Sequence, residues 1–346
     1  MLTRSPTISP SGIASPRAAM PTPAPGAISS AQPQTAAATP WEGYGLGLLG
    51  VLIFSLTLPM TRVVVAEWPP LLAGLGRALV AALPAAVLLA VNCSRLPTRS
   101  EWPGVLGAAL GIVIGWPLLS TLALQSVSAS HGAVFNGLLP LSTALFATWR
   151  SGEKPARAFW GWAAVGAVLV TGYGLRQGQG ALQAGDLWLL LAVVAGGMGY
   201  AEGARAARTL GGARTICWAL VISAPLIAVP VAWMVGDAAE AARASGSVTS
   251  NRALLAFAWL SFGSMFLGFF AWYRGLAVGG IARVGQVQLL QPFLTVMACA
   301  LLFGEPVSGE TWVFAIAVIG VIVGGRRSLR GATAQPQPQP AARTQS

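Results

Sequence analysis

Long stretches without charge are the feature that most constrains this chain. Three of them, 102–124, 215–236 and 253–273, contain no Asp, Glu, Lys or Arg. A helix needs about 20 apolar residues to cross the hydrocarbon core of a bilayer, and only helices or closed barrels satisfy the backbone there. Because the apolar residues run continuously rather than alternating, the pattern predicts membrane-spanning helices and not barrel strands.

The composition excludes an ordinary soluble enzyme. Charged residues make up 9 % of the 346 residues, against roughly 25 % in a soluble domain, and the mean hydropathy is +0.67. So few charges could not cover the surface of a soluble fold of this size. The net charge of +11 does not indicate a nucleic-acid partner either, because the cations are spread thinly and form no basic face.

Apolar stretches separated by short polar joints predict an all-α integral membrane protein with ten transmembrane helices. The stretches are approximately 43–65, 68–91, 102–124, 126–149, 158–175, 186–206, 214–236, 253–273, 281–304 and 309–326. The two ends differ, because residues 1–40 and 329–346 are rich in Pro, Ala, Thr and Gln. Such segments bury too little to offset their ordering entropy, so we expect disordered tails.

The distribution of Lys and Arg predicts the orientation. With a cytoplasmic N-terminus, thirteen of them fall in the inner joints and the C-terminal flank, against three or four in the outer joints. This bias places both termini in the cytoplasm. One lysine against twenty arginines, with abundant Ala, Gly and Pro, indicates a GC-rich bacterial genome. We therefore expect a multi-pass protein of the inner (plasma) membrane.

The chain repeats itself with a shift of 152 residues. In that register Pro140 falls on Pro292, Trp160 on Trp312, and the Gly-Glu pair at 152–153 on the one at 304–305. Each half holds five spans, and an odd number makes the second half inverted relative to the first. Inverted repeats are typical of secondary transporters, which bind substrate between the halves. The predicted units are a tail over 1–40, repeats over 41–176 and 185–328, and a tail over 329–346.

These features resemble the drug/metabolite transporter superfamily, and its EamA-type permeases most. The similarity covers about 43–326 and is strongest over 271–306, with Pro292 in mid-span and Gly-Glu-Pro at the end. The resemblance implies two inverted five-helix repeats around a central cavity. It also implies a secondary transporter that exports small organic solutes by alternating access. Because the candidate cavity residues named below are richer in Arg than in acid, we expect amino acids, carboxylates or other zwitterions as substrates.

Arg77 is the strongest candidate for the substrate site, because it lies near the middle of the second apolar stretch. A cation at that depth is costly unless it is paired or hydrated. It either holds a carboxylate or phosphate of the substrate or bonds to nearby helix carbonyls. Trp116 and Tyr200 lie inside spans, where their rings could line a cavity and stack on the substrate.

Three amides form the second group of binding candidates. Asn136 and Gln288 fall on equivalent positions under the shift of 152 residues, and Gln288 and Gln291 share one face of a helix. Amides in hydrocarbon need hydrogen-bonding partners. A water-filled cavity or a neighbouring helix could each provide them.

Glu202, His131 and Arg62 are candidates for coupling or gating. Glu202 could exchange protons or bind an amine, or it could pair with Arg205 three residues along the helix. His131 could carry a proton in the physiological pH range, or act as a hydrogen-bonding residue at a helix end. Arg62 could form an outer gate with Glu67, or extend to the membrane interface. Proton coupling and uncoupled facilitated transport both stay open.

Nothing indicates covalent chemistry, so we expect no catalytic residue, cofactor or metal site and no enzymatic activity. The sequence holds no GxxxxGK[ST] loop and no HExxH, the three cysteines are widely spaced, and there is a single histidine. The expected partners are a small-molecule substrate and the lipid bilayer, with a homodimer left open. Two alternatives remain. A multidrug or cation efflux permease would need an accessible buried acid, and a non-transporting sensor or scaffold would have a dry, apolar midplane.

Overall fold

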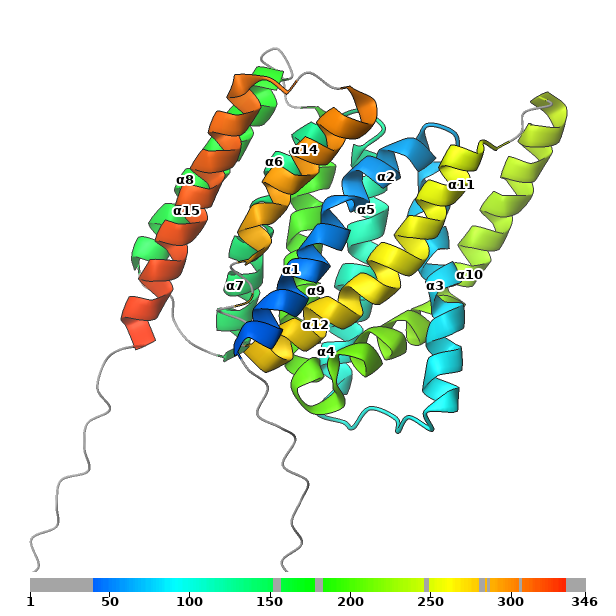
Figure 1. The fold of residues 1–346 in the computed structure, drawn as a ribbon, viewed down its shortest axis with the longest axis horizontal. Coiled ribbons are helices and arrows are strands. Elements are labelled where there is room, and N and C mark those ends of the chain that lie inside the picture. The colour runs from blue at the N-terminus through cyan, green and yellow to red at the C-terminus, as the bar shows by residue number, and fades with distance from the viewer. Residues whose placement is uncertain are drawn as a thin grey trace, which may run out of the picture. The chain divides into compact units, whose positions relative to one another are not determined.

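The computed structural model describes residues 40–151, 157–177, 183–245, 249–279, 284, 287–304 and 307–333. Within these ranges all regular structure is helical and no strand occurs, which confirms the all-α prediction for this part of the chain (Figure 1). Residues 1–39 and 334–346 of the predicted tails, and the Gly-Glu dipeptide at 152–153, lie outside the described ranges. The last helix continues to Thr333, past the predicted end of the second repeat at 328.

The first half of the chain forms a series of helices interrupted by short breaks. They are α1 (Pro40–Ser55), α2 (Thr57–Val65), α3 (Pro70–Val91), α4 (Trp102–Ala108), the π-helix η1 (Ala109–Gly115), α5 (Trp116–Ala123), α6 (Ala129–Asn136), α7 (Leu139–Ser151) and α8 (Arg157–Gln177).

The second half has longer helices at its start. They are α9 (Ala184–Leu210), α10 (Gly212–Ser245), α11 (Asn251–Ala258), the π-helix η2 (Trp259–Leu267), α12 (Gly268–Gly279), the 3₁₀ turn η3 (Val287–Leu290), α14 (Gln291–Phe303) and α15 (Gly309–Thr333).

Among the residues that the structure describes, six stretches are long and apolar enough to cross a membrane. They are Trp41–Val65, Pro70–Val91, Trp102–Ala123, Ala184–Leu210, Gly212–Ala238 and Asn251–Gly279. Each coincides closely with a stretch predicted from the sequence. The other four predicted spans correspond to α6 with α7, to α8, to η3 with α14, and to α15. None of these meets the same length and hydropathy criteria over the described residues.

Two of the predicted spans are broken at prolines. A proline lacks an N–H, and its ring clashes with the carbonyl four residues earlier. Pro140 therefore ends α6 at Asn136, four residues before it, and α7 starts afresh at Leu139. Pro292 lies in the first turn of α14 in the same way, preceded by the 3₁₀ turn η3. The predicted span 126–149 is thus two short helices and not one.

Two π-helical segments interrupt the third and eighth predicted spans at equivalent places. Shifted by 152 residues, η1 falls on 261–267, which lies within η2. A π-helical segment inserts extra residues into a helix and is frequent at functional sites. Both segments contribute to the site described below.

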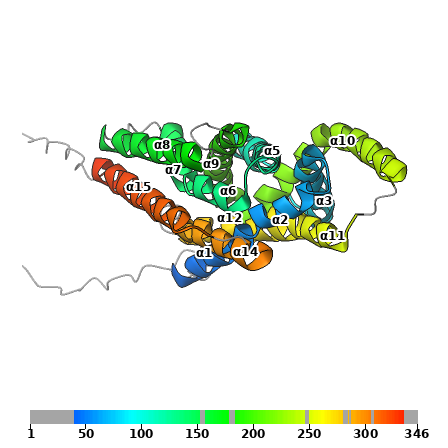
Figure 2. The ribbon, with the colours of Figure 1, turned by 90° about the horizontal axis from the view of Figure 1, so that it is seen from above.

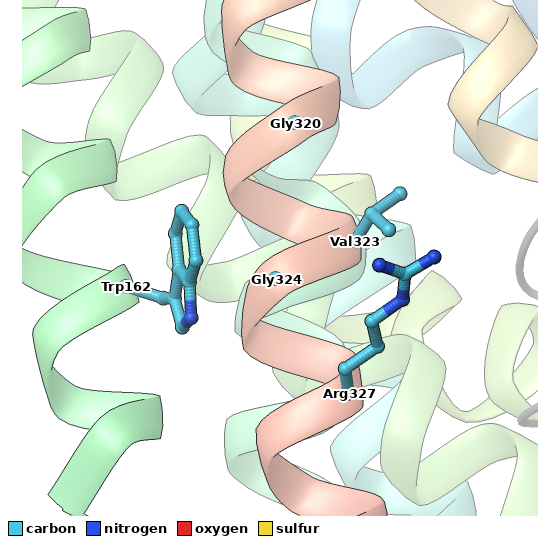
Figure 3. A pocket seen from close by; sticks show the side chains of 5 residues that line it. All are labelled: Trp162, Gly320, Val323, Gly324 and Arg327. Atoms are coloured by element: carbon cyan, nitrogen blue, oxygen red, sulfur yellow. The ribbon is translucent and has the colours of Figure 1, made fainter.

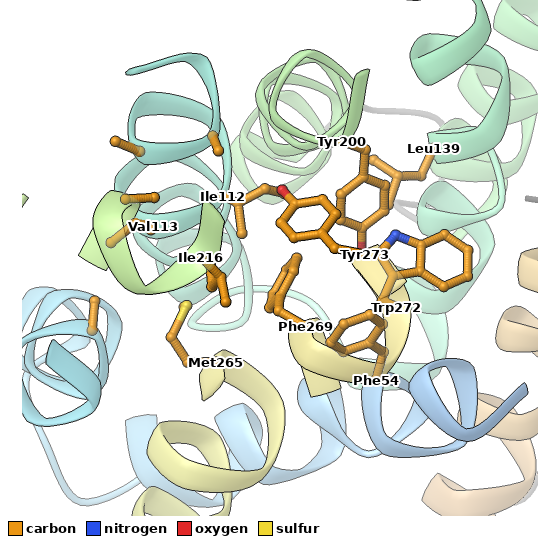
Figure 4. Close-up of a cluster of buried hydrophobic side chains, with 14 of the residues drawn as sticks. Phe54, Ile112, Val113, Leu139, Tyr200, Ile216, Met265, Phe269, Trp272 and Tyr273 are labelled. Atoms are coloured by element: carbon orange, nitrogen blue, oxygen red, sulfur yellow. The ribbon is translucent and has the colours of Figure 1, made fainter. Parts of the chain in front are cut away.

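The helices pack around α9, which contacts α4, α5 and α7, while α1 packs on α12 and α3 on α10. α8 and α15 lie side by side, and α15 also contacts α6, α7 and α14 (Figure 2). Aromatic rings from α1, α9 and α12 meet inside the bundle (Figure 4). The ring of Phe54 lies 4.9 Å from that of Phe269, and the ring of Tyr200 lies 5.7 Å from that of Trp272.

A polar clamp fixes the loop between α3 and α4. Arg95 donates two hydrogen bonds of 2.7 Å to the two carboxylate oxygens of Glu101, and the backbone N–H of Thr98 donates a third, of 2.8 Å. The Glu101 side chain is only 4 % exposed. These bonds, first from Arg95 and then from Thr98, hold the pKa of Glu101 well below its usual value of 4.5.

We expect Glu101→Gln to lower the melting temperature of the protein by a few degrees, because the clamp loses its charge. The carboxylate has a lowered pKa in the folded state, so its contribution is complete above about pH 5 and is lost as the pH falls further. The difference between Glu101→Gln and the unsubstituted protein should therefore shrink below that pH. Thermal unfolding in detergent from pH 4 to 8 measures it. Glu42→Gln, which breaks the exposed pair with Arg274, is the control and should change little. An equal loss in both variants would contradict the clamp.

Candidate functional site

A small enclosed cavity lies where helices of both halves converge. The free space within it, about 20 Å³ for the centre of a water-sized sphere, holds an ordered water or two and not a metabolite. The helices are thus closed around the site in this conformation. The lining residues are Phe54, Thr57, Leu58, Arg77, Ile112, Trp116, Asn136, Leu139, Tyr200, Ser264, Met265, Phe269 and Gln291.

Arg77 reaches this cavity because α3 packs very closely on α5. A Cβ on Gly74 would lie 2.9 Å from the carbonyl oxygen of Pro117, so only glycine fits there. Arg77, one turn further along the same face of α3, is then carried into the interior and is 1 % exposed.

The guanidinium of Arg77 is under-satisfied. Its Nη1 donates one long hydrogen bond, of 3.3 Å, to Thr61 Oγ1. Its Nε and Nη2 have no partner among the described residues, and no Asp or Glu lines the cavity. Removing a guanidinium from water without a counter-charge costs several kcal/mol, so Arg77 presents an uncompensated positive charge to the cavity.

Two amides face the same space with free oxygens. Asn136 Oδ1 and Gln291 Oε1 have no hydrogen-bond partner in the described part of the chain, while Gln291 Nε2 lies 3.5 Å from the carbonyl oxygen of Phe54. The proline breaks position both residues, Asn136 at the end of α6 and Gln291 at the start of α14. Each amide carries both donors and an acceptor, so together they can bind an anion or an ammonium group.

Most of the remaining lining is apolar. Ile112, Leu139, Met265 and Phe269 come from four different elements, and the hydroxyls of Thr57 and Ser264 bond to each other at 2.8 Å. Neither hydroxyl has a signal in the sequence that marks it as a candidate site residue. A site with one cation, two amides and apolar walls suits a small molecule that has an anionic group and an apolar body.

Glu202 lies outside this lining, at a different contact. Its carboxylate, on α9, is 6 % exposed and accepts hydrogen bonds from Arg150 Nε, on α7, and from Arg205 Nη2 at 2.7 Å. Arg205 is the neighbour considered from the sequence. Arg150 comes from another helix, and the spacing carries no signal for it.

The structure does not bring Arg62 and Glu67 together. Arg62 Nη1 donates to the carbonyl oxygen of Leu124 at 2.5 Å, at the end of α5. Glu67 instead accepts hydrogen bonds from Ser250, from Oγ at 2.5 Å and from the backbone N–H at 2.9 Å. These bonds, the Oγ bond first, lower the pKa of Glu67. The two residues therefore have other partners in this conformation, and the Arg62–Glu67 gate pair stays a prediction.

His131 has a buried partner that the sequence analysis missed. Its Nε2 lies 2.6 Å from Oδ1 of Asp186, near the start of α9. Asp186 lies 55 residues from His131 along the chain, and this spacing carries no signal for the contact.

Comparison with known proteins identifies the family. Residues 41–172 and 183–324 both match the model of the EamA-like transporter family. The chain belongs to this family. The resemblance drawn from the repeat and the Gly-Glu segments is thereby confirmed.

The relatives agree with this assignment. The transporter is 43 % identical over 286 residues to "Uncharacterized transporter YdeK" of Bacillus subtilis (strain 168), covering 83 % of this chain and 97 % of that protein. A crystal structure described only as that of a protein has a TM-score of 0.54 at 17 % identity, over 83 % of this chain and 98 % of that one. That similarity shows the fold alone. The family and the relative are transporters, which agrees with the expectation of a non-enzyme.

Gln288 and a second hollow lie away from the transporter's cavity. Gln288 is buried in η3, and its Nε2 has no partner among the described residues, but it does not line the cavity.

The second hollow is an open groove of about 590 Å³ between α8 and α15, lined by Trp162, Gly320, Val323, Gly324 and Arg327 (Figure 3). A Cβ on Gly324 would clash with the Trp162 ring, so α8 and α15 pack closely at this position beside the groove. None of the predicted site residues lies in it.

Proposed function

We propose that the transporter carries small organic acids, including amino acids, outward across the plasma membrane by alternating access. The proposed binding residues at the cavity are Arg77, Trp116, Asn136, Tyr200 and Gln291. Gln288 in η3, which does not line the cavity in this conformation, is proposed as a further one. The single observation that supports this substrate class is Arg77, a buried cation with free N–H groups and no acid in the lining of its cavity.

The free edge of Arg77 has the shape of a carboxylate receptor. Nε–H and Nη2–H lie on one edge of the planar guanidinium and point in parallel, while Nη1 is used by Thr61. Such an edge binds the two oxygens of a carboxylate at once. A substrate carboxylate would supply the counter-charge that the cavity lacks.

The repeat supports alternating access between two inverted halves of five spans. Under the shift of 152 residues, Ile112 falls on Ser264 and Leu139 on Gln291, and all four line the cavity. The π-helices η1 and η2 correspond in the same register. Substrate sites of inverted-repeat transporters lie between the halves. The excess of arginine in alternate joints supports both termini in the cytoplasm.

The geometry disfavours the two alternatives. Efflux of a lipophilic cation would require an acid in the cavity, and the buried Glu202 is already held by Arg150 and Arg205. A sensor or scaffold would have a dry, apolar midplane. The cavity instead contains a guanidinium and two amides with unsatisfied atoms.

Counterflow in proteoliposomes tests the proposal. Vesicles loaded with unlabelled solute would be given labelled L-leucine, L-glutamate, pyruvate or the lipophilic cation tetraphenylphosphonium, with unsubstituted protein and with Glu202→Gln. We expect at least one acid to exchange in the unsubstituted protein and the cation not to exchange. Exchange of the cation alone, abolished in Glu202→Gln, would favour cation efflux and contradict the proposal.

A further inference from the structure

A buried pair of titratable groups lies apart from the substrate cavity. His131 Nε2 and Asp186 Oδ1 are 2.6 Å apart, and their side chains are 7 % and 4 % exposed. The second oxygen of Asp186 accepts the backbone N–H of Gln183 at 2.9 Å, in a capping box that begins α9. The backbone N–H of His131 donates to Ser128, the N-cap of α6. Hydrogen bonds at the starts of α6 and α9 thus fix the positions of His131 and Asp186 relative to their own helices.

Two features of the surroundings stabilise an imidazolium against the cost of its burial. His131 lies between the rings of Phe135 and Tyr173, with centroids at 5.2 Å and 5.1 Å. Aromatic faces within about 6 Å stabilise a cation, and the carboxylate of Asp186 supplies a negative charge in the same place. The ring can therefore be held in either of its protonation states.

Other charged groups on α8 and on the elements packed against α6 and α8 include Arg176, Glu310 and Arg62, the last on α2 and bonded to the carbonyl oxygen of Leu124. Tyr173 of α8 contacts Thr311 of α15 through its hydroxyl at 3.4 Å, and the adjoining Arg176 of α8 pairs with Glu310 of α15. With a neutral imidazole that donates Nε2–H, the His131–Asp186 pair carries one negative charge. When Nδ1 takes up a proton, the pair becomes neutral.

Both helices that hold the pair also reach the substrate cavity. α6 is only eight residues long, from Ala129 to Asn136, and Asn136 at its other end lines the cavity. A hydrogen-bonded turn at residues 137–138 separates α6 from α7. α9 runs unbroken from Asp186 to Tyr200, which lines the cavity as well. A change in the contact between His131 and Asp186 would shift α6 relative to α9. Such a shift would move Asn136 and Tyr200, the two proposed binding residues on these helices.

We propose that the His131–Asp186 pair is the proton-binding site that couples a pH gradient to substrate movement. One proton binds at His131 Nδ1, and the pair changes its charge from −1 to 0 without breaking a covalent bond. The coupling rests on the proposed function, whereas the proton site can be tested separately.

The chain offers an unusually direct test, because His131 is its single histidine. Protein labelled with ¹³C-histidine and purified on a tag without histidine gives one Cε1 resonance, which needs no assignment. We expect this resonance to titrate with a single midpoint as the pH is varied through the physiological range. The midpoint should lie at lower pH in Asp186→Asn, since the imidazolium loses its counter-charge. A resonance that does not titrate, or a midpoint unchanged in Asp186→Asn, would overturn the proton site.

Transport assays of variants test the coupling between proton binding and substrate movement. In His131→Gln and Asp186→Asn we expect accumulation driven by a pH gradient to fall by about tenfold or more, while exchange without a gradient persists. Glu42→Gln removes an exposed carboxylate elsewhere and should accumulate solute normally. Gradient-driven accumulation in His131→Gln equal to that of the unsubstituted protein would overturn the coupling.

The two proposals fail in different ways. If none of L-leucine, L-glutamate and pyruvate exchanges, the proposed function is overturned, while the histidine titration still decides the proton site. If one of them exchanges, its presence should move the midpoint of the His131 resonance, because linkage is reciprocal. An unchanged midpoint at a saturating concentration would overturn the coupling.

Discussion

Arg77→Met is expected to abolish exchange of carboxylates and at the same time to raise the melting temperature of the protein. Losing a buried charged contact to the substrate costs about 2–5 kcal/mol of binding free energy, which is roughly 30-fold to several thousand-fold in affinity. The unliganded protein, in contrast, loses a buried charge that has one long hydrogen bond. Methionine fills a similar volume without that penalty, and such replacements stabilise by about 1–4 kcal/mol. Counterflow and thermal unfolding of the same preparation measure both effects.

The opposite result would separate the two interpretations of Arg77. If Arg77 served mainly to bond helix carbonyls, Arg77→Met would lower the melting temperature and impair transport only through unfolding. Arg77→Lys is the matched control, since it keeps the charge but loses the flat two-donor edge. We expect Arg77→Lys to exchange carboxylates more weakly than the unsubstituted protein and to gain no stability.

Gly43→Ala should destabilise the protein strongly, because α1 and α12 cross with their backbones almost in contact. A Cβ on Gly43 would lie 2.5 Å from Cα and 2.8 Å from N of Gly279. Backbone atoms cannot turn aside as a flexible side chain can, so the two helices must separate. Overpacking of this kind costs about 1–3 kcal/mol and sometimes more. The melting temperature in detergent should fall by several degrees.

Gly45→Ala provides the control on the same helix. A Cβ on Gly45 meets nothing within 4 Å, and alanine has the higher helix propensity. Gly45→Ala should therefore leave the melting temperature unchanged or raise it slightly. Equal losses at Gly43 and Gly45 would show that the close crossing of α1 and α12 is not what makes Gly43 necessary.

The spans could be predicted where the apolar run was unbroken. The stretches 102–124, 215–236 and 253–273 follow directly from hydropathy, because burial in lipid depends on composition more than on sequence detail. The interruption at Asn136 was less predictable. Pro140 signals a bend, but whether a proline kinks one helix or ends it depends on the neighbours that satisfy the freed carbonyls. The π-helices have no local signal in the sequence.

Residues of the candidate site could be predicted where a polar side chain interrupts an apolar stretch of the sequence. Arg77, Asn136 and Gln291 are polar residues within apolar runs, and such residues need a reason to be there. Thr57 and Ser264 escaped notice, because small hydroxyl residues are common in membrane helices and bond to nearby groups. Asp186 was missed because an acid at the start of a helix is ordinary. Its contact with His131 depends on tertiary packing.

The most direct test of the anion site compares an acid with its own amide. Counterflow of the acid that exchanges best among L-leucine, L-glutamate and pyruvate would be measured against unlabelled competitor, either that acid or its primary amide at the same carboxyl group. The two competitors have nearly the same shape, but the amide lacks the charge that Arg77 is proposed to bind. We predict that the acid competes at least about tenfold better, the effect of about 1.4 kcal/mol. Equal competition by the amide would contradict an anion site at Arg77.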